Sequence, residues 1–208
     1  MIKNILWAVD GVLFDTYPAI TYAISRSLND LGLPVALNEI DALTRQSIDH
    51  CLATLSRRFK LDPGLLRLRF DESCLKVPPE RQPPFPGARD VCALIHRRGR
   101  NIIATHRSID FARQLLRTHG FAKYFAGIVS VTEGYAHKPD PALFEAALQR
   151  FNLEKKNTLI IGSRAIDMQA GRAAGLTTCL FDSAHVSEPV DHHFNNFSQF
   201  LDWLRSQR

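Results

Sequence analysis

Short apolar runs recur along this chain, and the first of them spans residues 5–9. Asp10 and Gly11 follow it, and this dipeptide favours a turn because glycine tolerates backbone angles that other residues resist. A short apolar run that ends at a turn signal is typical of a strand buried on both faces. Further runs of this kind occupy residues 101–105, 127–131, 157–161 and 177–181. The hydrophobic pattern therefore predicts a sheet of buried strands.

Segments with helical spacing of their apolar positions separate these strands. They predict helices at residues 88–98, 109–119, 141–151 and 165–174, and a closing helix at 194–205. Gly120 and Pro141 support these bounds, because glycine often ends helices and proline is favoured in a first turn. Strands that alternate with such helices predict an α/β fold, with a doubly wound parallel sheet and helices on both faces.

Residues 17–82 lack the strand pattern. Their amphipathic spacing predicts helices at 17–31, from 38 onward, at 46–59, and from 62 towards 76. The prolines of residues 77–87 disfavour a helix and predict an extended linker. We therefore expect a core domain formed by residues 1–16 and 83–208, with a small helical domain, residues 17–82, inserted after the first strand.

The composition is ordinary for a globular protein, with 45% hydrophobic residues. No apolar run approaches the roughly 20 residues that a membrane helix needs. The first residues lead directly into a strand pattern, which differs from a signal peptide. We expect a cytoplasmic protein without a membrane partner.

The net charge of +5 raises the question of nucleic-acid binding. The basic residues are spread over helical segments, such as 57–60 and 96–100, rather than gathered in one stretch. Cations near helix ends complement the helix dipole. This distribution argues against a nucleic-acid partner and leaves a modest attraction for small anions.

The cysteines and histidines show no metal-binding spacing. Isolated cysteines predict reduced, buried thiols, with a cysteine nucleophile paired to a histidine as the alternative. The cysteines are Cys51, Cys74, Cys92 and Cys179. We expect the adjacent histidines at 192–193 to lie in an exposed loop.

Polar residues that could carry chemistry follow four of the predicted strands, the edge at which open α/β sheets bind ligands. They are Asp10, Thr105, Lys138 and Asp167. The Thr105 hydroxyl could donate a hydrogen bond to an anion, or it could cap the next helix. Lys138 could neutralise an anion, or it could lie on the surface before a helix that a proline begins.

The region of the first strand resembles the first motif of the haloacid dehalogenase (HAD) superfamily of phosphohydrolases. That motif has two aspartates separated by one residue, then glycine and threonine or valine, and residues 10–13 and 15–16 match it. Ala8 stands where the resemblance places the nucleophilic aspartate. The stretches around Thr105 and Lys138, and residues 162–175, are similar to the other three motifs, so the resemblance spans the chain.

The helical insert makes the chain most similar to the phosphoglycolate phosphatase and beta-phosphoglucomutase branch. This likeness implies a HAD-like, Rossmann-type core with a helical-bundle cap. It also implies that Thr105, His106 and Lys138 bind the phosphate, and that Asp10 protonates the leaving group.

The resemblance further implies a magnesium site. In the family the ligands are the nucleophile, a fourth-motif aspartate and the backbone carbonyl of the second aspartate, which corresponds here to Asp10. Ser163 stands at the place of the fourth-motif aspartate, while Asp167 matches the second acid of that motif. Because Mg²⁺ prefers carboxylate oxygens, we expect its binding to be weak or absent here.

Ala8 and Ser163 together predict impaired catalysis. Loss of a nucleophile commonly lowers a rate by about 10⁴-fold or more. We therefore expect a phosphatase scaffold with impaired or no activity, and whether the chain is an enzyme stays open. Ala8 could be a natural loss or an engineered inactivation, and the second departure, Ser163, favours a natural loss.

Three function classes fit these observations. The first is a phosphomonoester hydrolase that works by an unusual route. The second is a non-catalytic binder of a small phosphorylated metabolite, or of phosphate or sulfate. The third is an interaction or regulatory protein that meets a protein partner through the helical domain. Within that domain, Arg45 and Ser47 are candidate substrate contacts, with a place on a solvated helix face as the alternative.

Overall fold

The computed structural model describes residues 1–181 and 188–207. The chain separates into two compact units. The first unit comprises Met1–Asp15 and Pro83–Arg208, and the second comprises Thr16–Gln82. These bounds differ from the expected domain bounds only at Thr16. Each unit has its own hydrophobic core and is described separately below.

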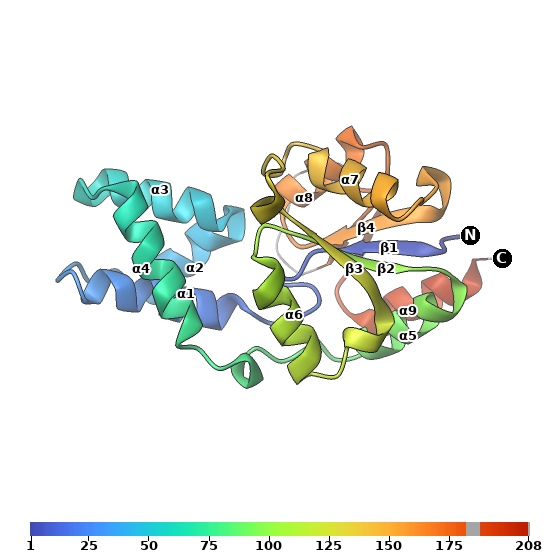
Figure 1. Ribbon diagram of the computed structural model, residues 1–208, viewed down its shortest axis with the longest axis horizontal. Helices are drawn as coiled ribbons and strands as arrows, with labels where there is room; N and C mark the ends of the chain where they lie inside the picture. The colour runs from blue at the N-terminus through green and yellow to red at the C-terminus, as the bar shows by residue number, and fades with distance from the viewer. Residues whose placement is uncertain (182–187, 208) are drawn as a thin grey trace. The chain divides into compact units, whose positions relative to one another are not determined.

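The first unit is built on a parallel sheet with the strand order β3-β2-β1-β4-β5-β6 (Figure 1). The strands are β1 (Asn4–Trp7), β2 (Asn101–Thr105), β3 (Phe125–Ser130), β4 (Thr158–Gly162), β5 (Thr177–Phe181) and β6 (His192–Phe194). The order reverses on either side of β1, which is the arrangement of a doubly wound sheet. The predicted α/β fold is therefore confirmed.

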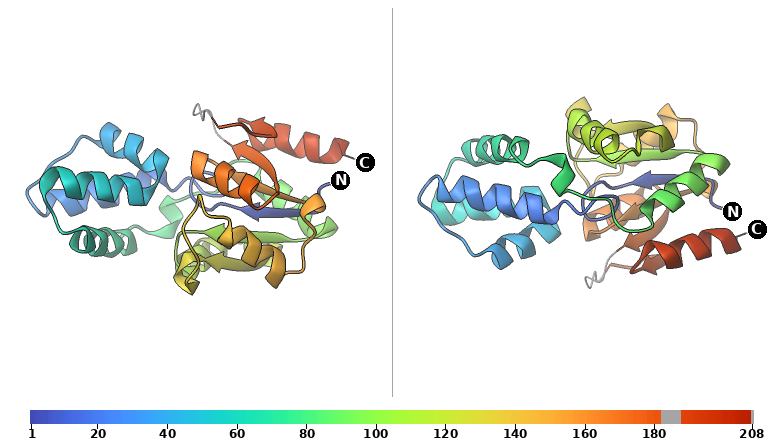
Figure 2. Two further views of the ribbon diagram at one scale, coloured as in Figure 1. Left: turned by 90° about the horizontal axis from the view of Figure 1, so that it is seen from above. Right: turned by 90° about the horizontal axis from the view of Figure 1, so that it is seen from below.

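Helices cover both faces of this sheet (Figures 1 and 2). They are α5 (Ala88–Arg98), α6 (Ile109–Thr118), α7 (Ala142–Arg150), α8 (Ala165–Ala173) and α9 (Phe197–Ser206). Apolar residues of α5, α6 and α9 share one core cluster with Ile5 and Trp7, while those of α7 and α8 share another with Leu6. This alternation along β1 is the two-residue period of a strand, and it explains why the run is apolar throughout.

Helix α8 packs closely on the sheet because of one glycine. A Cβ atom at Gly171 would lie 2.5 Å from Cγ2 of Ile160 on β4 and 3.0 Å from Cγ2 of Thr178 on β5. A larger residue would push the helix away from both strands. Gly171 thus allows the close packing of α8 on the sheet.

The second unit contains four α-helices and no strand within residues 16–82. The helices are α1 (Tyr17–Asn29), α2 (Leu37–Gln46), α3 (Ile48–Phe59) and α4 (Pro63–Leu75). Side chains at the N-caps define where two of them begin: Ser47 accepts from the N–H of His50, and Asp62 accepts from that of Leu65. Its core holds Ile20, Ile24, Leu28, Ile40, Cys51, Leu55, Leu66 and Phe70.

Short 3₁₀ turns join several of the elements in both units. They are η1 (Pro79–Arg81), η2 (Ala122–Tyr124), η3 (Val131–Glu133) and η4 (Lys155–Asn157). Among residues 1–181 and 188–207, no helix combines the length and the apolar character that crossing a membrane requires.

The prediction for the C-terminal region is wrong in two places. The histidines at 192–193 belong to strand β6, which pairs with β5, instead of an exposed loop. The carboxylate of Asp191 accepts from both N–H and Oγ1 of Thr178, and this contact holds the segment against β5. The last helix begins at Phe197 instead of residue 194, because Asn196 accepts from the N–H of Gln199 and caps it there.

The cysteine prediction is confirmed for three of the four thiols. All four are free, and Cys51, Cys92 and Cys179 are buried, whereas Cys74 is partly exposed. Burial raises the pKa of Cys51 to about 12, with a smaller contribution from Glu39. Burial also raises the pKa of Cys92 and Cys179 well above the ordinary value. These thiols stay protonated at neutral pH, which makes them poor nucleophiles.

Candidate functional site

The candidate site lies in the first unit, where the parallel strands end. Ala8 directly follows β1 and is 2% exposed. Its N–H donates to the carbonyl of Ile161 on β4 at 3.0 Å, so its backbone continues the sheet. Its side chain is a methyl group within the core cluster of that face. The position that the resemblance assigns to a nucleophile therefore carries no oxygen.

Asp10 lies in a tight turn beyond Ala8. The N–H of Gly11 donates to the carbonyl of Phe14 at 3.0 Å, and the N–H of Phe14 donates to that of Val9 at 3.2 Å. Gly11 has a φ of 69°, a conformation that residues with a side chain rarely adopt. Asp10 itself is 4% exposed, and its backbone carbonyl accepts from Oγ of Ser163 at 3.2 Å.

A buried ion pair connects the loop before α7 with the first turn of α8. Nζ of Lys138 lies 2.8 Å from Oδ1 of Asp167, and both side chains are fully buried. The same Nζ donates to the carbonyl of Ala104 at 3.0 Å. Gly162 leaves space for the carboxylate, since a Cβ atom there would lie 2.8 Å from Cγ of Asp167. The structure thus brings two of the sequence candidates into direct contact.

Arg164 is a further charged group at this site, and the sequence analysis missed it. It is 4% exposed, and its Nε lies 3.4 Å from Oδ2 of Asp167, which also accepts from the backbone N–H of Arg164 at 3.2 Å. Burial would raise the pKa of Asp167, but Lys138 and Arg164 outweigh it and hold that pKa well below the ordinary range. Arg164 directly follows Ser163 in the stretch that is similar to the fourth motif, and this position could have identified it as a site residue.

Burial has the opposite effect on Lys138. It lowers the pKa of this ammonium group, and the nearby charge of Arg164 lowers it further. The carboxylate of Asp167 opposes both effects. A buried charge is stable only when it is paired and hydrogen-bonded, as this one is.

Thr105 and His106 lie at the end of β2, next to Lys138. Oγ1 of Thr105 accepts from the N–H of Arg107 at 3.0 Å, while Ser108 accepts from the N–H of Phe111 and caps α6. The capping alternative for Thr105 is therefore wrong. A threonine hydroxyl can also donate, so its O–H remains suited to an oxyanion.

His106 has a positioning contact. Its Nε2 accepts from the backbone N–H of Lys138 at 2.9 Å, and its ring lies 4.7 Å from that of His137. Burial lowers the pKa of His106 to about 3, and the positive charges of Lys138 and Arg164 contribute. His106 is therefore neutral at physiological pH and holds the Lys138 backbone, rather than offering a cation.

The remaining two candidates, Arg45 and Ser47, belong to the second unit. Ser47 caps α3 through its contact with His50, at 2.9 Å. Arg45 lies 3.4 Å from Asp41, and its guanidinium is 3.9 Å from the centre of the Tyr17 ring. Both side chains thus have structural contacts within their own unit.

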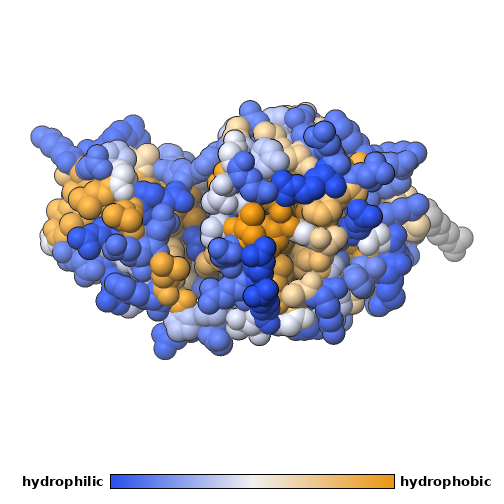
Figure 3. Space-filling model, viewed as in Figure 1, coloured by the Kyte–Doolittle hydropathy of each residue, from blue (hydrophilic) through white to orange (hydrophobic). Residues whose placement is uncertain are grey.

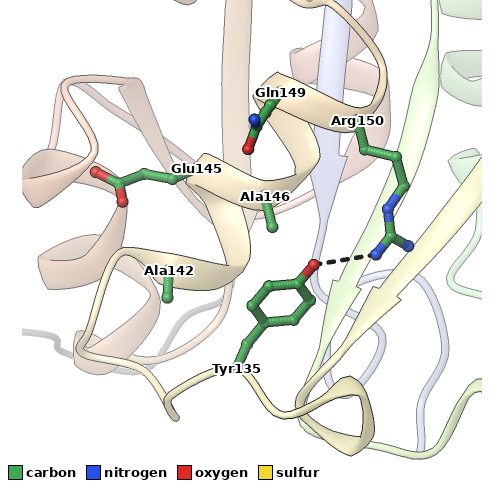
Figure 4. Close-up of a pocket in the computed structure, with 6 residues that line it drawn as sticks. All are labelled: Tyr135, Ala142, Glu145, Ala146, Gln149 and Arg150. Atoms are coloured by element: carbon green, nitrogen blue, oxygen red, sulfur yellow. Dashed lines mark hydrogen bonds between the residues drawn. The ribbon is translucent and has the colours of Figure 1, made fainter.

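A surface hollow elsewhere in the first unit has different chemistry (Figure 4). Residues of α7 and Tyr135 line it, and Figure 4 shows Arg150 pointing to the hydroxyl of Tyr135. Arg150 is also paired with Glu133 at 2.8 Å, so its charge is already compensated. None of the strand-end candidates lines this hollow.

The ligand groups that the resemblance assigns to Mg²⁺ do not fit the ion as they stand in this chain. Mg²⁺ needs oxygen ligands with near-octahedral geometry. Ala8 offers none, the carbonyl of Asp10 accepts from Ser163, and both carboxylate oxygens of Asp167 accept from cationic side chains. The positive charges of Lys138 and Arg164 would also repel a divalent cation.

Comparisons with known proteins agree on one family. A model of the haloacid dehalogenase-like hydrolases matches residues 2–175. A protein of Salmonella typhi named phosphoglycolate phosphatase is 26% identical over 198 residues, covering 84% of this chain and 79% of its own. A phosphoglycolate phosphatase of Photobacterium profundum is 25% identical over 223 residues, covering 98% and 96%.

Solved structures share the fold. A hydrolase from Pseudomonas syringae superposes with a TM-score of 0.81 at 22% identity, covering 100% of this chain and 99% of its own. A haloacid dehalogenase-like hydrolase from Streptococcus pneumoniae superposes with a TM-score of 0.83 at 17% identity, covering 98% of each chain.

Proposed function

The chain belongs to the haloacid dehalogenase-like hydrolase family, and from this premise we propose that it binds a small phosphorylated molecule at the strand ends of its first unit. We propose further that it hydrolyses phosphomonoesters poorly or not at all. The absence of any side-chain oxygen at Ala8 is the observation that carries this second part.

Phosphate binding is supported by the donors that remain at the site. Lys138 supplies a buried ammonium group, and two of its three N–H bonds donate to Asp167 and Ala104. The same ammonium group also lies 5.0 Å from the centre of the Phe144 ring. Thr105 follows Ala104 in β2 and has a hydroxyl that can donate. The relatives named phosphoglycolate phosphatases support a small phosphomonoester as the ligand class.

Impaired hydrolysis is supported by the geometry around Ala8. Covalent catalysis of phosphoryl transfer needs a nucleophilic oxygen in line with phosphorus. The Ala8 side chain is a methyl group within the apolar cluster, so it supplies no such oxygen. Asp10 is two residues further along, in the turn that Gly11 and Phe14 close, so its side chain starts from a different backbone position.

A phosphatase assay over a panel of phosphomonoesters, with and without Mg²⁺, tests this function. We expect phosphate release by the unmodified chain to be at background, while inorganic phosphate or phosphoglycolate raises its melting temperature. Turnover comparable to that of an active phosphatase would contradict the proposed impairment. The absence of any thermal shift would contradict the proposed binding.

An interaction role is the second candidate, and the surface of the second unit favours it. Of the exposed large apolar residues, most belong to this unit, and Figure 3 shows apolar side chains gathered on it. They are Tyr22, Leu37, Leu65, Leu68 and Leu75. A protein partner that co-purifies with the native chain, and is lost when Leu68 and Leu75 are changed to lysine, would support this role.

We propose the cytoplasm as the location of the protein.

A further inference from the structure

The two departures from the family motif change the charge of the site by a defined amount. Ala8 and Ser163 stand where the resemblance places two carboxylates, so two negative charges are missing. A divalent cation carries two positive charges. Removing both carboxylates and the cation leaves the net charge that a phosphate would meet unchanged. A phosphate dianion therefore needs no metal ion here for charge balance.

The Asp10 carbonyl and the Asp167 carboxylate already accept hydrogen bonds from donors of this chain. The Ser163 hydroxyl donates to the Asp10 carbonyl at 3.2 Å, so the residue that replaces one ligand also engages another. Lys138 and Arg164 lie on the two carboxylate oxygens of Asp167, at 2.8 and 3.4 Å. Bringing a cation to these oxygens would displace buried hydrogen bonds, which is costly.

Arg164 adds a buried positive charge close to the phosphate donors. Its side chain is 5% exposed, and its charge lowers the pKa of both His106 and Lys138. Arginine stays protonated in proteins, and its planar group suits phosphate oxygens. Lys138 and Arg164 both contact the buried carboxylate of Asp167, and Asp10 is a further buried acid whose charge acts on Lys138.

We propose that this site binds phosphate and phosphomonoesters independently of any divalent cation, with Lys138 and Arg164 supplying the positive charge that a metal ion would otherwise bring. The inference rests on the proposed phosphate-binding function and adds that this binding requires no metal ion. It distinguishes this chain from a metal-dependent phosphatase that has lost only its nucleophile, in which Mg²⁺ would still strengthen phosphate binding.

Titration calorimetry of the full chain with inorganic phosphate tests the proposal, in EDTA and again in Mg²⁺. Sodium chloride at equal ionic strength controls for screening. We expect dissociation constants that agree within about twofold between the two conditions. Phosphoglycolate, used in place of phosphate, shows whether the organic part of a ligand changes the result.

Ser163 offers a matched pair of variants. Ser163→Asp restores a carboxylate and should weaken phosphate binding in EDTA by about tenfold or more, with recovery in Mg²⁺. The asparagine of Ser163→Asn has nearly the same size as aspartate but no charge. This variant should therefore bind phosphate equally in EDTA and in Mg²⁺. Melting curves without phosphate establish that both variants are folded.

The outcomes separate the two proposals. Phosphate binding that requires Mg²⁺ in the unmodified chain would overturn metal independence and leave the phosphate-binding function standing. No binding of phosphate or phosphoglycolate in either condition would overturn the function itself. Equal behaviour of Ser163→Asp and Ser163→Asn would show that charge at this position does not govern the metal requirement, and would overturn the inference.

Discussion

Two parts of the candidate site differ in what their side chains have retained. Around Lys138 and Asp167, each charged group is buried and meets a partner of opposite charge. After β1, Ala8 has only a methyl group, although its backbone hydrogen bond to Ile161 keeps the strand in place. The comparison teaches that the charged groups and the position of the missing nucleophile are held independently, because Ala8 follows β1 whereas Lys138 and Asp167 lie before α7 and in the first turn of α8.

The sharpest way to break this contrast is to restore both missing carboxylates. Ala8→Asp with Ser163→Asp should raise Mg²⁺-dependent phosphatase activity by on the order of 10⁴-fold, because a nucleophile and a metal ligand return together. Release of phosphate from phosphoglycolate measures the effect. The double change to asparagine is the matched control and should stay inactive. An inactive double-aspartate variant that binds phosphate normally would contradict the view of an otherwise intact site.

Removing the retained acid tests the other side of the comparison. Asp167→Ala leaves Lys138 and Arg164 buried without their carboxylate, and should lower the free energy of unfolding by about 3–5 kcal/mol. Urea denaturation measures the loss. Asp167→Asn keeps the size and one acceptor oxygen, so its loss should be smaller. A change below about 1 kcal/mol for the alanine variant would mean that the pair is dispensable for stability.

Acid should reveal the neutral state of His106. Because its pKa in the folded chain is lowered to about 3, mainly by burial, the unfolded chain binds a proton that the folded chain does not. This difference in proton binding begins as the pH falls below about 6.5, the ordinary pKa of histidine. The free energy of unfolding is therefore not reduced by His106 above that pH, and it decreases as the pH falls from there towards the pKa of the folded chain.

The expected loss of stability from His106 is at most about 1.4 kcal/mol for each pH unit in that range. Urea denaturation at pH values from about 7 to 5 should show a steeper decline for the unmodified chain than for His106→Gln, which keeps an acceptor but does not titrate. Parallel declines for the two proteins would assign the acid sensitivity to other groups.

The smallest effect is expected in the second unit. Ser47→Ala removes the N-cap of α3 and should lower the free energy of unfolding by about 1 kcal/mol. Asp62→Ala, which removes the N-cap of α4, is the matched control. If Ser47 only caps a helix, both variants should change phosphate affinity equally little. A selective loss of affinity in Ser47→Ala would instead support a substrate contact.

The pattern along the chain was sufficient to predict most of the fold. Buried strands and amphipathic helices are local signals, so β2 and β5 lie at the predicted residues and α5 also does. Strand β6 escaped prediction because its three residues are stabilised by pairing with β5 and by the Asp191 contact. Such long-range hydrogen bonds leave no periodic trace in the sequence.

For the site, the sequence by itself determined which chemical groups exist: a methyl at Ala8, a hydroxyl at Ser163, an ammonium at Lys138 and a carboxylate at Asp167. Only the tertiary structure decided how they are used. It placed Ser163 on the Asp10 carbonyl, buried Arg164, and held both cations against one carboxylate. The physical reason is that partners 29 and 153 residues apart along the chain meet only when the parallel strands bring their ends together.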